Sequence, residues 1–100
     1  MEIKEIPRGQ LSTIILSTLL DGDKYGYEII KDIEIKSGGK IKIKQPSLYS
    51  SLTRMENQKL ISSYWRDSDI GGRRHYYRLT DFGRKQTEQW QNDFMNSNSV

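Results

Sequence analysis

The spacing of the apolar residues changes along the chain, and this change constrains the fold more than any other feature. From Leu11 to Met55 they recur every three or four positions in three separate segments, as on one face of an α-helix. From Leu60 to Thr80 that period is absent, and it returns after Phe82. A chain of 100 residues can build one modest core. The sequence therefore predicts a single, mainly α-helical fold with a small β-hairpin.

Turn residues separate the three helical segments. The first segment follows Pro7-Arg8-Gly9 and stops at Asp21-Gly22-Asp23, and the second ends before Ser37-Gly38-Gly39. The third opens at Gln45-Pro46, where the missing N–H of proline costs nothing. We expect two helices joined by a tight turn, followed by a third helix.

The third helix should have one apolar and one polar face. Leu48, Leu52 and Met55 share one side. The opposite side is small, polar and partly basic, and it carries Ser47, Ser50, Thr53, Arg54 and Asn57. Before this helix, residues 41–44 read Ile-Lys-Ile-Lys. That alternation predicts a brief, half-buried strand with both lysines on its solvent face.

Two further strands should form the hairpin. We expect them over residues 60–67 and 73–80, joined by a Gly-rich tip at residues 68–72. Tyr77 and Leu79 should lie on one face of the second strand. Thr80 or Asp81 should then cap a last helix with an apolar stripe and a polar tail. The stripe comprises Phe82, Gln86, Trp90 and Phe94.

The charges are segregated along the chain. Between Lys36 and Arg78 there are ten Lys or Arg and three acids, a net charge of +7, whereas residues 1–35 carry −3 and residues 79–100 carry −1. A basic middle with acidic flanks is typical of a fold that presents one face to a polyanion.

Several classes of protein are disfavoured by composition. With no cysteine and His75 as the one histidine, we expect no disulfide, no structural metal and no cofactor. The sequence has no long apolar run and no signal-peptide order at its N-terminus, which predicts a cytoplasmic protein without a membrane span. Tyr25-Gly26-Tyr27-Glu28 pairs a phenol with a carboxylate, but no nucleophile or second carboxylate joins it, so we predict no enzymatic activity. Gly26 should instead allow close approach of another helix.

The order of elements predicts a winged helix-turn-helix. In that fold the third helix enters the major groove of DNA and the hairpin, or wing, reaches an adjacent groove or the backbone. Lys42, Lys44, Arg73 and Arg74 should then bind phosphates, whereas Gln45, Ser47, Ser50 and Arg54 should read bases. Tyr49, at the edge of the apolar stripe, should contact a phosphate.

Three motifs, in this order, resemble the PadR family of bacterial phenolic-acid decarboxylase regulators. They are Tyr25–Ile29 (YGYEI), Pro46–Glu56 (PSLYSSLTRME) and Gly72–Gly83 (GRRHYYRLTDFG), and the resemblance covers roughly residues 8–95. It implies a repressor with a winged-helix domain over residues 1–80. It also implies dimerisation through the C-terminal helix of residues 81–100, which ends in a polar tail. The narrow apolar stripe of that helix, with Trp90 and Phe94, should then meet a second copy on a palindromic operator; the alternative is that it packs on the first helix of the same chain.

The resemblance has further implications and two departures. It implies that Tyr49 and the wing at Arg73 and Arg74 touch DNA, and that Trp90 could stack on a small aromatic effector near the dimer interface. Ser50 stands where the family usually has proline, and Lys59 where it usually has glycine. Since lysine lacks the freedom of glycine at positive φ, the turn that closes the third helix is expected to take another form.

Two alternatives remain open at this level. The same helix and wing could bind an acidic partner protein. A single-stranded DNA or RNA module would need exposed aromatic residues on a sheet. Tyr64, Trp65, Tyr76 and Tyr77 are candidates for that role.

Overall fold

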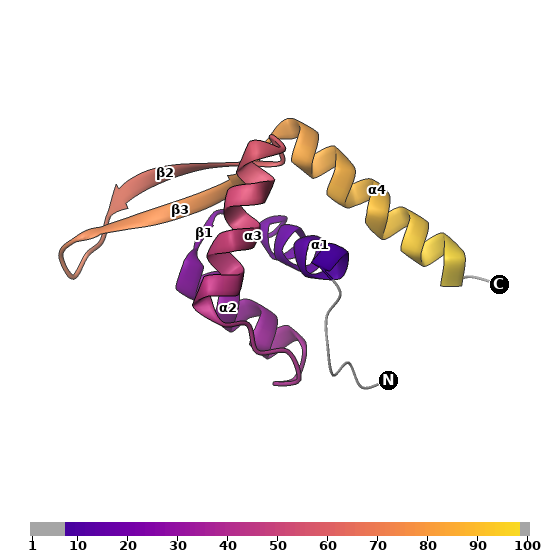
Figure 1. Cartoon of the computed structure of the whole chain (residues 1–100), viewed down its shortest axis with the longest axis horizontal. Helices are drawn as coiled ribbons and strands as arrows, with labels where there is room; N and C mark the ends of the chain where they lie inside the picture. The colour runs from indigo at the N-terminus through magenta and orange to yellow at the C-terminus, as the bar shows by residue number, and fades with distance from the viewer. Residues whose placement is uncertain (1–7, 99–100) are drawn as a thin grey trace.

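A computed structural model of the chain describes residues 8–98, with side chains for residues 11–92. It confirms the predicted class, a mainly helical winged helix-turn-helix with a hairpin and a long last helix (Figure 1). The elements are α1 (Arg8–Leu19), β1 (Lys24–Tyr25), α2 (Gly26–Lys36), α3 (Gln45–Asn57), β2 (Ile61–Asp67), β3 (Arg73–Leu79) and α4 (Asp81–Asn98).

The core lies where α1, α2 and α3 meet the base of the hairpin. The predicted stripe of α3 is confirmed, because Leu48, Leu52 and Met55 are all buried. Tyr77 and Leu79 of β3 are buried on the same side of the sheet, as predicted. Buried side chains from five elements thus share one cluster, so the orientation of α3 is fixed by its apolar face.

The sheet has three antiparallel strands in the order β1-β3-β2. The third strand is β1, not the predicted segment 41–44, which lies outside any strand. That prediction was wrong: β3 pairs on one edge with β1 and on the other with β2, and residues 41–44 join neither outer edge of the sheet. Ile41 and Ile43 are nevertheless partly buried against the core while Lys42 and Lys44 are exposed. The alternation in the sequence therefore reflects an extended segment that packs one side on the core without forming the backbone hydrogen bonds of a strand.

The turn after α3 corrects a second expectation. Lys59 adopts φ 65°, so the left-handed turn forms although the residue is not glycine. The Leu60 N–H donates to the Met55 carbonyl, and the Lys59 N–H to the Glu56 carbonyl, each at 3.0 Å. This pair of bonds is the Schellman motif that glycine usually completes. The backbone at Lys59 is strained, since a left-handed conformation costs an L-residue about 1–2 kcal/mol.

The start of α4 is locked onto this turn. Thr80 caps the helix as predicted, because its Oγ1 accepts the Gly83 N–H at 2.9 Å. The same hydroxyl donates to the Lys59 carbonyl at 2.7 Å. A Cβ placed on Gly83 would lie 1.9 Å from the Leu60 carbonyl oxygen. Only glycine lets α4 begin this close to the end of α3.

The molecule is elongated, with principal extents of 50 × 29 × 21 Å. Figure 1 shows why: the hairpin and α4 project in opposite directions from the body formed by α1, α2 and α3. Within the described part of the chain, no helix has both the length and the apolar character needed to cross a bilayer.

Candidate nucleic-acid interface

The N-terminal half of α3 presents a polar surface. Gln45, Ser47 and Ser50 are exposed, while Leu48 on the opposite side anchors the helix in the core. Lys42 and Lys44 are also exposed and directly precede the helix. Because no side chain caps this end, its backbone N–H groups and the positive end of the helix dipole add to the charge of the lysines. Five of the predicted DNA-binding residues are thus brought together.

Tyr49 lies beside this surface and packs on α2. Its side chain is 44% exposed. A Cβ on Gly26 would lie 2.6 Å from the Tyr49 hydroxyl oxygen, so glycine leaves the space that this ring occupies. Gly26 therefore allows the close approach that the sequence predicts, and the partner is a side chain of α3.

The wing tip has the geometry expected of its sequence. The Ser68 N–H donates to the Gly72 carbonyl at 2.9 Å, and the Ser68 hydroxyl donates to the Gly71 carbonyl at 2.7 Å. Gly71 and Gly72 have φ values of 91° and 81°, which favour glycine. The tip is a tight, hydrogen-bonded turn.

Arg73 and Arg74 directly follow the tip, and their side chains lie on opposite faces of the hairpin. The Arg73 guanidinium lies over the Trp65 ring at 5.5 Å, and the Arg74 guanidinium over the Tyr25 ring at 4.5 Å. Arg66 pairs with Arg74 across the strands and lies over the Tyr76 ring at 5.5 Å. Arg66 was missed as a candidate, although it lies two residues before the tip at residues 68–72 and Arg74 lies two residues after it, which could have suggested that the two are partners across the hairpin.

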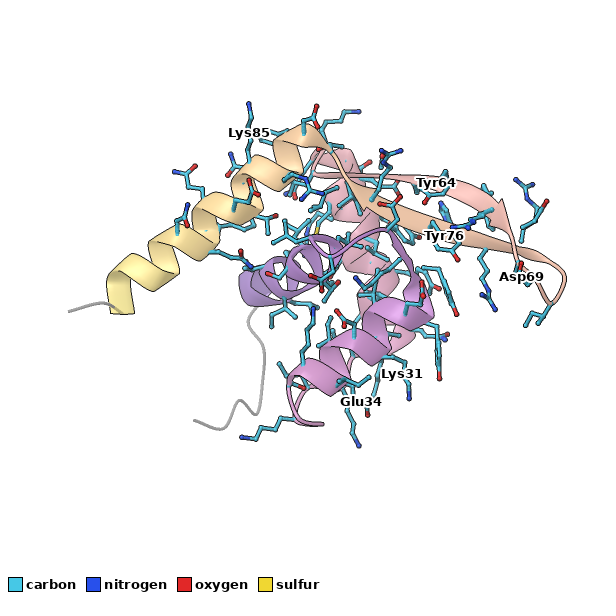
Figure 2. The ribbon with its side chains drawn as sticks, turned by 180° about the vertical axis from the view of Figure 1, so that it is seen from behind. Lys31, Glu34, Tyr64, Asp69, Tyr76 and Lys85 are labelled. Atoms are coloured by element: carbon cyan, nitrogen blue, oxygen red, sulfur yellow. The ribbon has the colours of Figure 1, made fainter. Side chains whose placement is uncertain are left out.

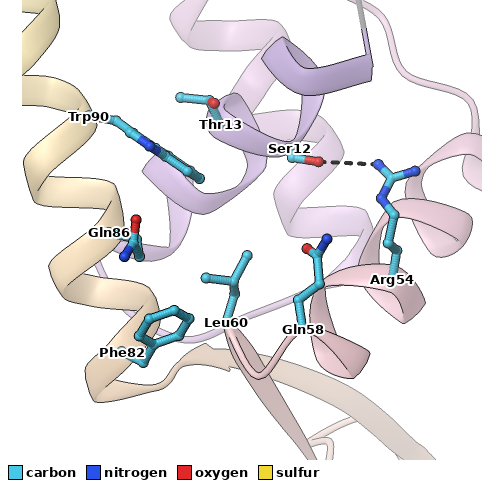
Figure 3. A pocket seen from close by; sticks show the side chains of 8 residues that line it. All are labelled: Ser12, Thr13, Arg54, Gln58, Leu60, Phe82, Gln86 and Trp90. Carbon is cyan, nitrogen blue, oxygen red and sulfur yellow. Dashed lines mark hydrogen bonds between the residues drawn. The ribbon is translucent and has the colours of Figure 1, made fainter.

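Arg54 is not brought together with the N-terminal residues of α3. Its Nη2 donates to the Ser12 hydroxyl of α1 at 3.2 Å, and the side chain points into a pocket beside α4 (Figure 3). The residue lies about two and a half turns from Gln45. The structure therefore places Arg54 at the side of α3 that faces the last helix.

Lys36, one of the ten cations of the basic segment, is engaged by acids. Its Nζ lies 2.5 Å from Asp21 and 3.1 Å from Asp32. The Asp21 hydrogen bond raises the pKa of Lys36, and the same contact lowers the pKa of Asp21. Lys36 is therefore committed to an intramolecular ion pair. Among the described residues, no group of histidines and carboxylates could hold a metal ion.

The pocket in Figure 3 lies between α4, α1 and α3 and has a volume of about 620 Å³. Phe82 and Trp90 form its aromatic wall and are 51% and 36% exposed. It is lined by Ser12, Thr13, Arg54, Gln58, Leu60, Phe82, Gln86 and Trp90. The side chain of Phe94, the other predicted interface residue, lies outside the described side chains. The apolar stripe of α4 is thus only partly covered within one chain.

Comparisons with known proteins agree with this fold. Residues 15–89 match the sequence model of the transcriptional regulator PadR-like family. A protein of Lysinibacillus sphaericus, named uncharacterized protein X, is 40% identical over 80 residues, which cover 80% of this chain and 73% of that protein.

Two solved structures are similar over most of their length. A transcriptional regulator from Clostridium thermocellum is 42% identical, with a TM-score of 0.78, and the match covers 93% of this chain and 90% of that one. A PadR family regulator from Clostridium difficile R20291 is 34% identical, with a TM-score of 0.77 and coverage of 90% and 92%. These relatives are regulators, in agreement with the prediction that the chain is not an enzyme. The chain belongs to the PadR-like family of transcriptional regulators.

Proposed function

We propose that this regulator binds double-stranded DNA in a sequence-specific manner, as a homodimer, and represses transcription. The observation that carries the proposal is the exposed polar end of α3, flanked by Lys42 and Lys44, on a helix whose other face is buried in the core. A helix held in this way, with small side chains outward, fits the major groove.

The residues divide into two roles. Gln45, Ser47 and Ser50 read base edges, because short side chains let the helix sit deep in the groove. Cations before α3 and around the wing tip bind phosphates together with the Tyr49 hydroxyl. These cations are Lys42, Lys44, Arg66, Arg73 and Arg74. Arg54 stays a predicted base contact but lies apart from the three base-reading residues, because its Nη2 donates to Ser12 of α1.

A salt titration tests this proposal. If each protomer contributes four to five phosphate contacts, the logarithm of duplex affinity should fall with log salt at a slope of about −7 to −9. Arg73→Ala should make the slope less steep by about 2, since a dimer loses two contacts. Lys85→Ala is the charge-matched control, on α4 away from the hairpin tip (Figure 2), and should leave the slope unchanged.

The outcome also separates the alternatives. Binding to single strands in preference to duplex would favour the single-strand module. If the protein did not bind duplex DNA at low salt, the proposal would be wrong, and an acidic partner protein would explain the basic surface instead.

We infer that dimerisation uses α4. Phe82 and Trp90 are exposed on α4, most of whose other residues are polar, and a narrow apolar stripe needs a partner surface to be stable. A second copy can supply one through a two-fold axis, which would match a palindromic operator. Trp90→Ala should weaken the dimer in sedimentation at micromolar concentration. Gln89→Ala, on the neighbouring exposed position, is the control and should behave like the wild type.

We also propose that a small effector binds in the pocket beside α4, between Trp90 and Arg54. A planar aromatic ligand could stack on Trp90, and Arg54 adds a guanidinium suited to a carboxylate. Because Arg54 belongs to α3, such a ligand would act directly on the DNA-reading helix. Quenching of tryptophan fluorescence by aromatic carboxylates, compared between the wild type and Arg54→Gln, tests this idea. Equal quenching by uncharged analogues would argue against a role for Arg54.

A further inference from the structure

The outer half of the wing extends beyond the core. The buried residues of the hairpin, Ile61, Tyr77 and Leu79, all lie at its base. Beyond Tyr77 towards the tip, the side chains of both strands are exposed or only half-buried. An isolated two-stranded ribbon is marginally stable in water. Side-chain contacts other than the core must therefore order the part of the wing that carries the arginines.

Tyr76 lies at the centre of such contacts. It stacks on Tyr64, its partner across the strands, with ring centroids 5.7 Å apart and an angle of 12° between planes. It also meets Tyr25 of β1 edge to face, at 5.5 Å and 72°. Figure 2 shows Tyr64 and Tyr76 next to each other on the hairpin. One ring from each strand thus forms a tyrosine cluster (Tyr25, Tyr64, Tyr76) on the face opposite Tyr77.

Two arginines rest on this cluster. The Arg66 guanidinium lies 5.5 Å from the Tyr76 ring centroid, and the Arg74 guanidinium 4.5 Å from that of Tyr25. An arginine over a ring is held by the ring's negative face while its N–H groups stay free to donate to phosphate. The contacts therefore order the cations without consuming their donors.

The cluster is also tied to the helical body. The Tyr64 hydroxyl donates to the Asp23 carboxylate at 2.7 Å, in the connection between α1 and β1. Tyr25 itself directly precedes α2. On the other face, Trp65 stacks on His75, and the His75 ring lies 4.7 Å from the ring of Tyr77, which belongs to the core. The Ser63 hydroxyl of β2 also donates to the Glu56 carboxylate of α3 at 2.9 Å. Among these links between the wing and the helices, the tyrosine cluster is the one on which Arg66 and Arg74 rest.

We propose that Tyr76 is a positioning residue of the DNA interface, which holds Arg66 and Arg74 in place for phosphate binding without touching DNA itself. This inference rests on the proposed function. An ordered guanidinium loses less entropy when it binds, so the benefit appears on the specific site, where the protein is held in one register and each arginine faces one phosphate. Loosely held arginines would still attract any duplex by charge.

The experiment compares two probes. One is a duplex selected by the wild-type protein from a random pool, and the other is a scrambled duplex of equal length, both at one salt concentration. Tyr76→Leu should weaken binding to the selected duplex about tenfold, the equivalent of one charge-assisted contact, and binding to the scrambled duplex less than about twofold. Tyr76→Phe keeps the ring and should bind like the wild type.

A double-mutant cycle shows whether Tyr76 acts through the arginines. In a background of Arg66→Ala with Arg74→Ala, Tyr76→Leu should cause no further loss on the selected duplex. If Tyr76→Leu is unfolded at the assay temperature, Tyr25→Leu removes the ring beneath Arg74 and serves for the same comparison.

The outcomes are distinguishable. Equal losses on both duplexes, an undiminished effect in the arginine-free background, or no loss at all would overturn the positioning role while leaving DNA binding intact. Failure of the wild type to select any duplex would overturn the proposed function itself.

Discussion

Gly83→Ala offers a test in which two physical effects have opposite signs. Gly83 lies in the first turn of α4, and alanine is the better helix former by about 1 kcal/mol. Helix propensity alone therefore predicts a more stable protein. The packing predicts the reverse, because the new Cβ would lie 1.9 Å from the Leu60 carbonyl oxygen and 2.8 Å from its carbon.

The size of the effect follows from what must move. Side-chain carbons essentially never approach an oxygen within 3.0 Å, so α4 and the turn must separate by more than 1 Å. The Thr80 N–H donates to the same Leu60 oxygen at 3.1 Å, and separation stretches that bond past a useful length. Overpacking of about 1–3 kcal/mol and a lost hydrogen bond of about 1 kcal/mol outweigh the propensity gain, which leaves a net destabilisation of about 2 kcal/mol.

Urea unfolding measures this difference at a single protein concentration, because a dimer's stability depends on concentration. The melting temperature should fall by roughly 8–16 °C. Lys85→Ala, an exposed position two residues along the same helix, should change stability by less than about 0.5 kcal/mol. If Gly83→Ala matched or exceeded the wild type in stability, the account of how α4 is attached would be refuted.

Three further predictions concern single residues. Lys59→Gly should raise the free energy of unfolding by about 0.5–1 kcal/mol, since it relieves the strain at φ 65° at some cost in unfolded-chain entropy; a drop in the urea midpoint would contradict this. Burial raises the pKa of Tyr77 to about 12 from 10.0. The neutral phenol therefore stabilises the folded state fully below pH 10, and this stabilisation is lost as the pH rises from 10 to 12. Tyr77→Phe should lose less stability over that range in urea unfolding, and parallel pH profiles would argue against the buried phenol. Gly26→Ala should displace the Tyr49 ring and weaken binding of the selected duplex roughly threefold to tenfold, as Tyr49→Ala should, with little change in melting temperature; unchanged affinity in fluorescence anisotropy would rule out a contact by Tyr49.

The pocket beside α4 connects two parts of the molecule with different proposed roles. Trp90 belongs to the helix proposed to dimerise, and Arg54 belongs to the helix proposed to read DNA. Anything that fills this space, a second copy or a small ligand, contacts both. A change in the dimer could therefore alter the position of α3, which is a physical route from dimerisation to operator affinity.

The sequence by itself determined the number and order of the helices, the hairpin and its tip, and the inward faces. The repeat of Leu48, Leu52 and Met55, the proline at the start of α3 and the glycines of the wing tip are local signals. They act within a few residues of the chain, so they can be read without knowing the rest of the fold.

Tertiary structure decided what lies next to what. The strand beside β3 at one edge of the sheet is β1, two residues without an apolar pattern. Residues 41–44 pair with no strand, although their sequence alternates as in a strand. Tertiary structure also turned Arg54 towards Ser12, and it forced Lys59 into a conformation that glycine favours. Each outcome depends on a partner distant in sequence. Pairing, close approach and backbone strain are settled by the packing of the whole core, which no short stretch of residues encodes.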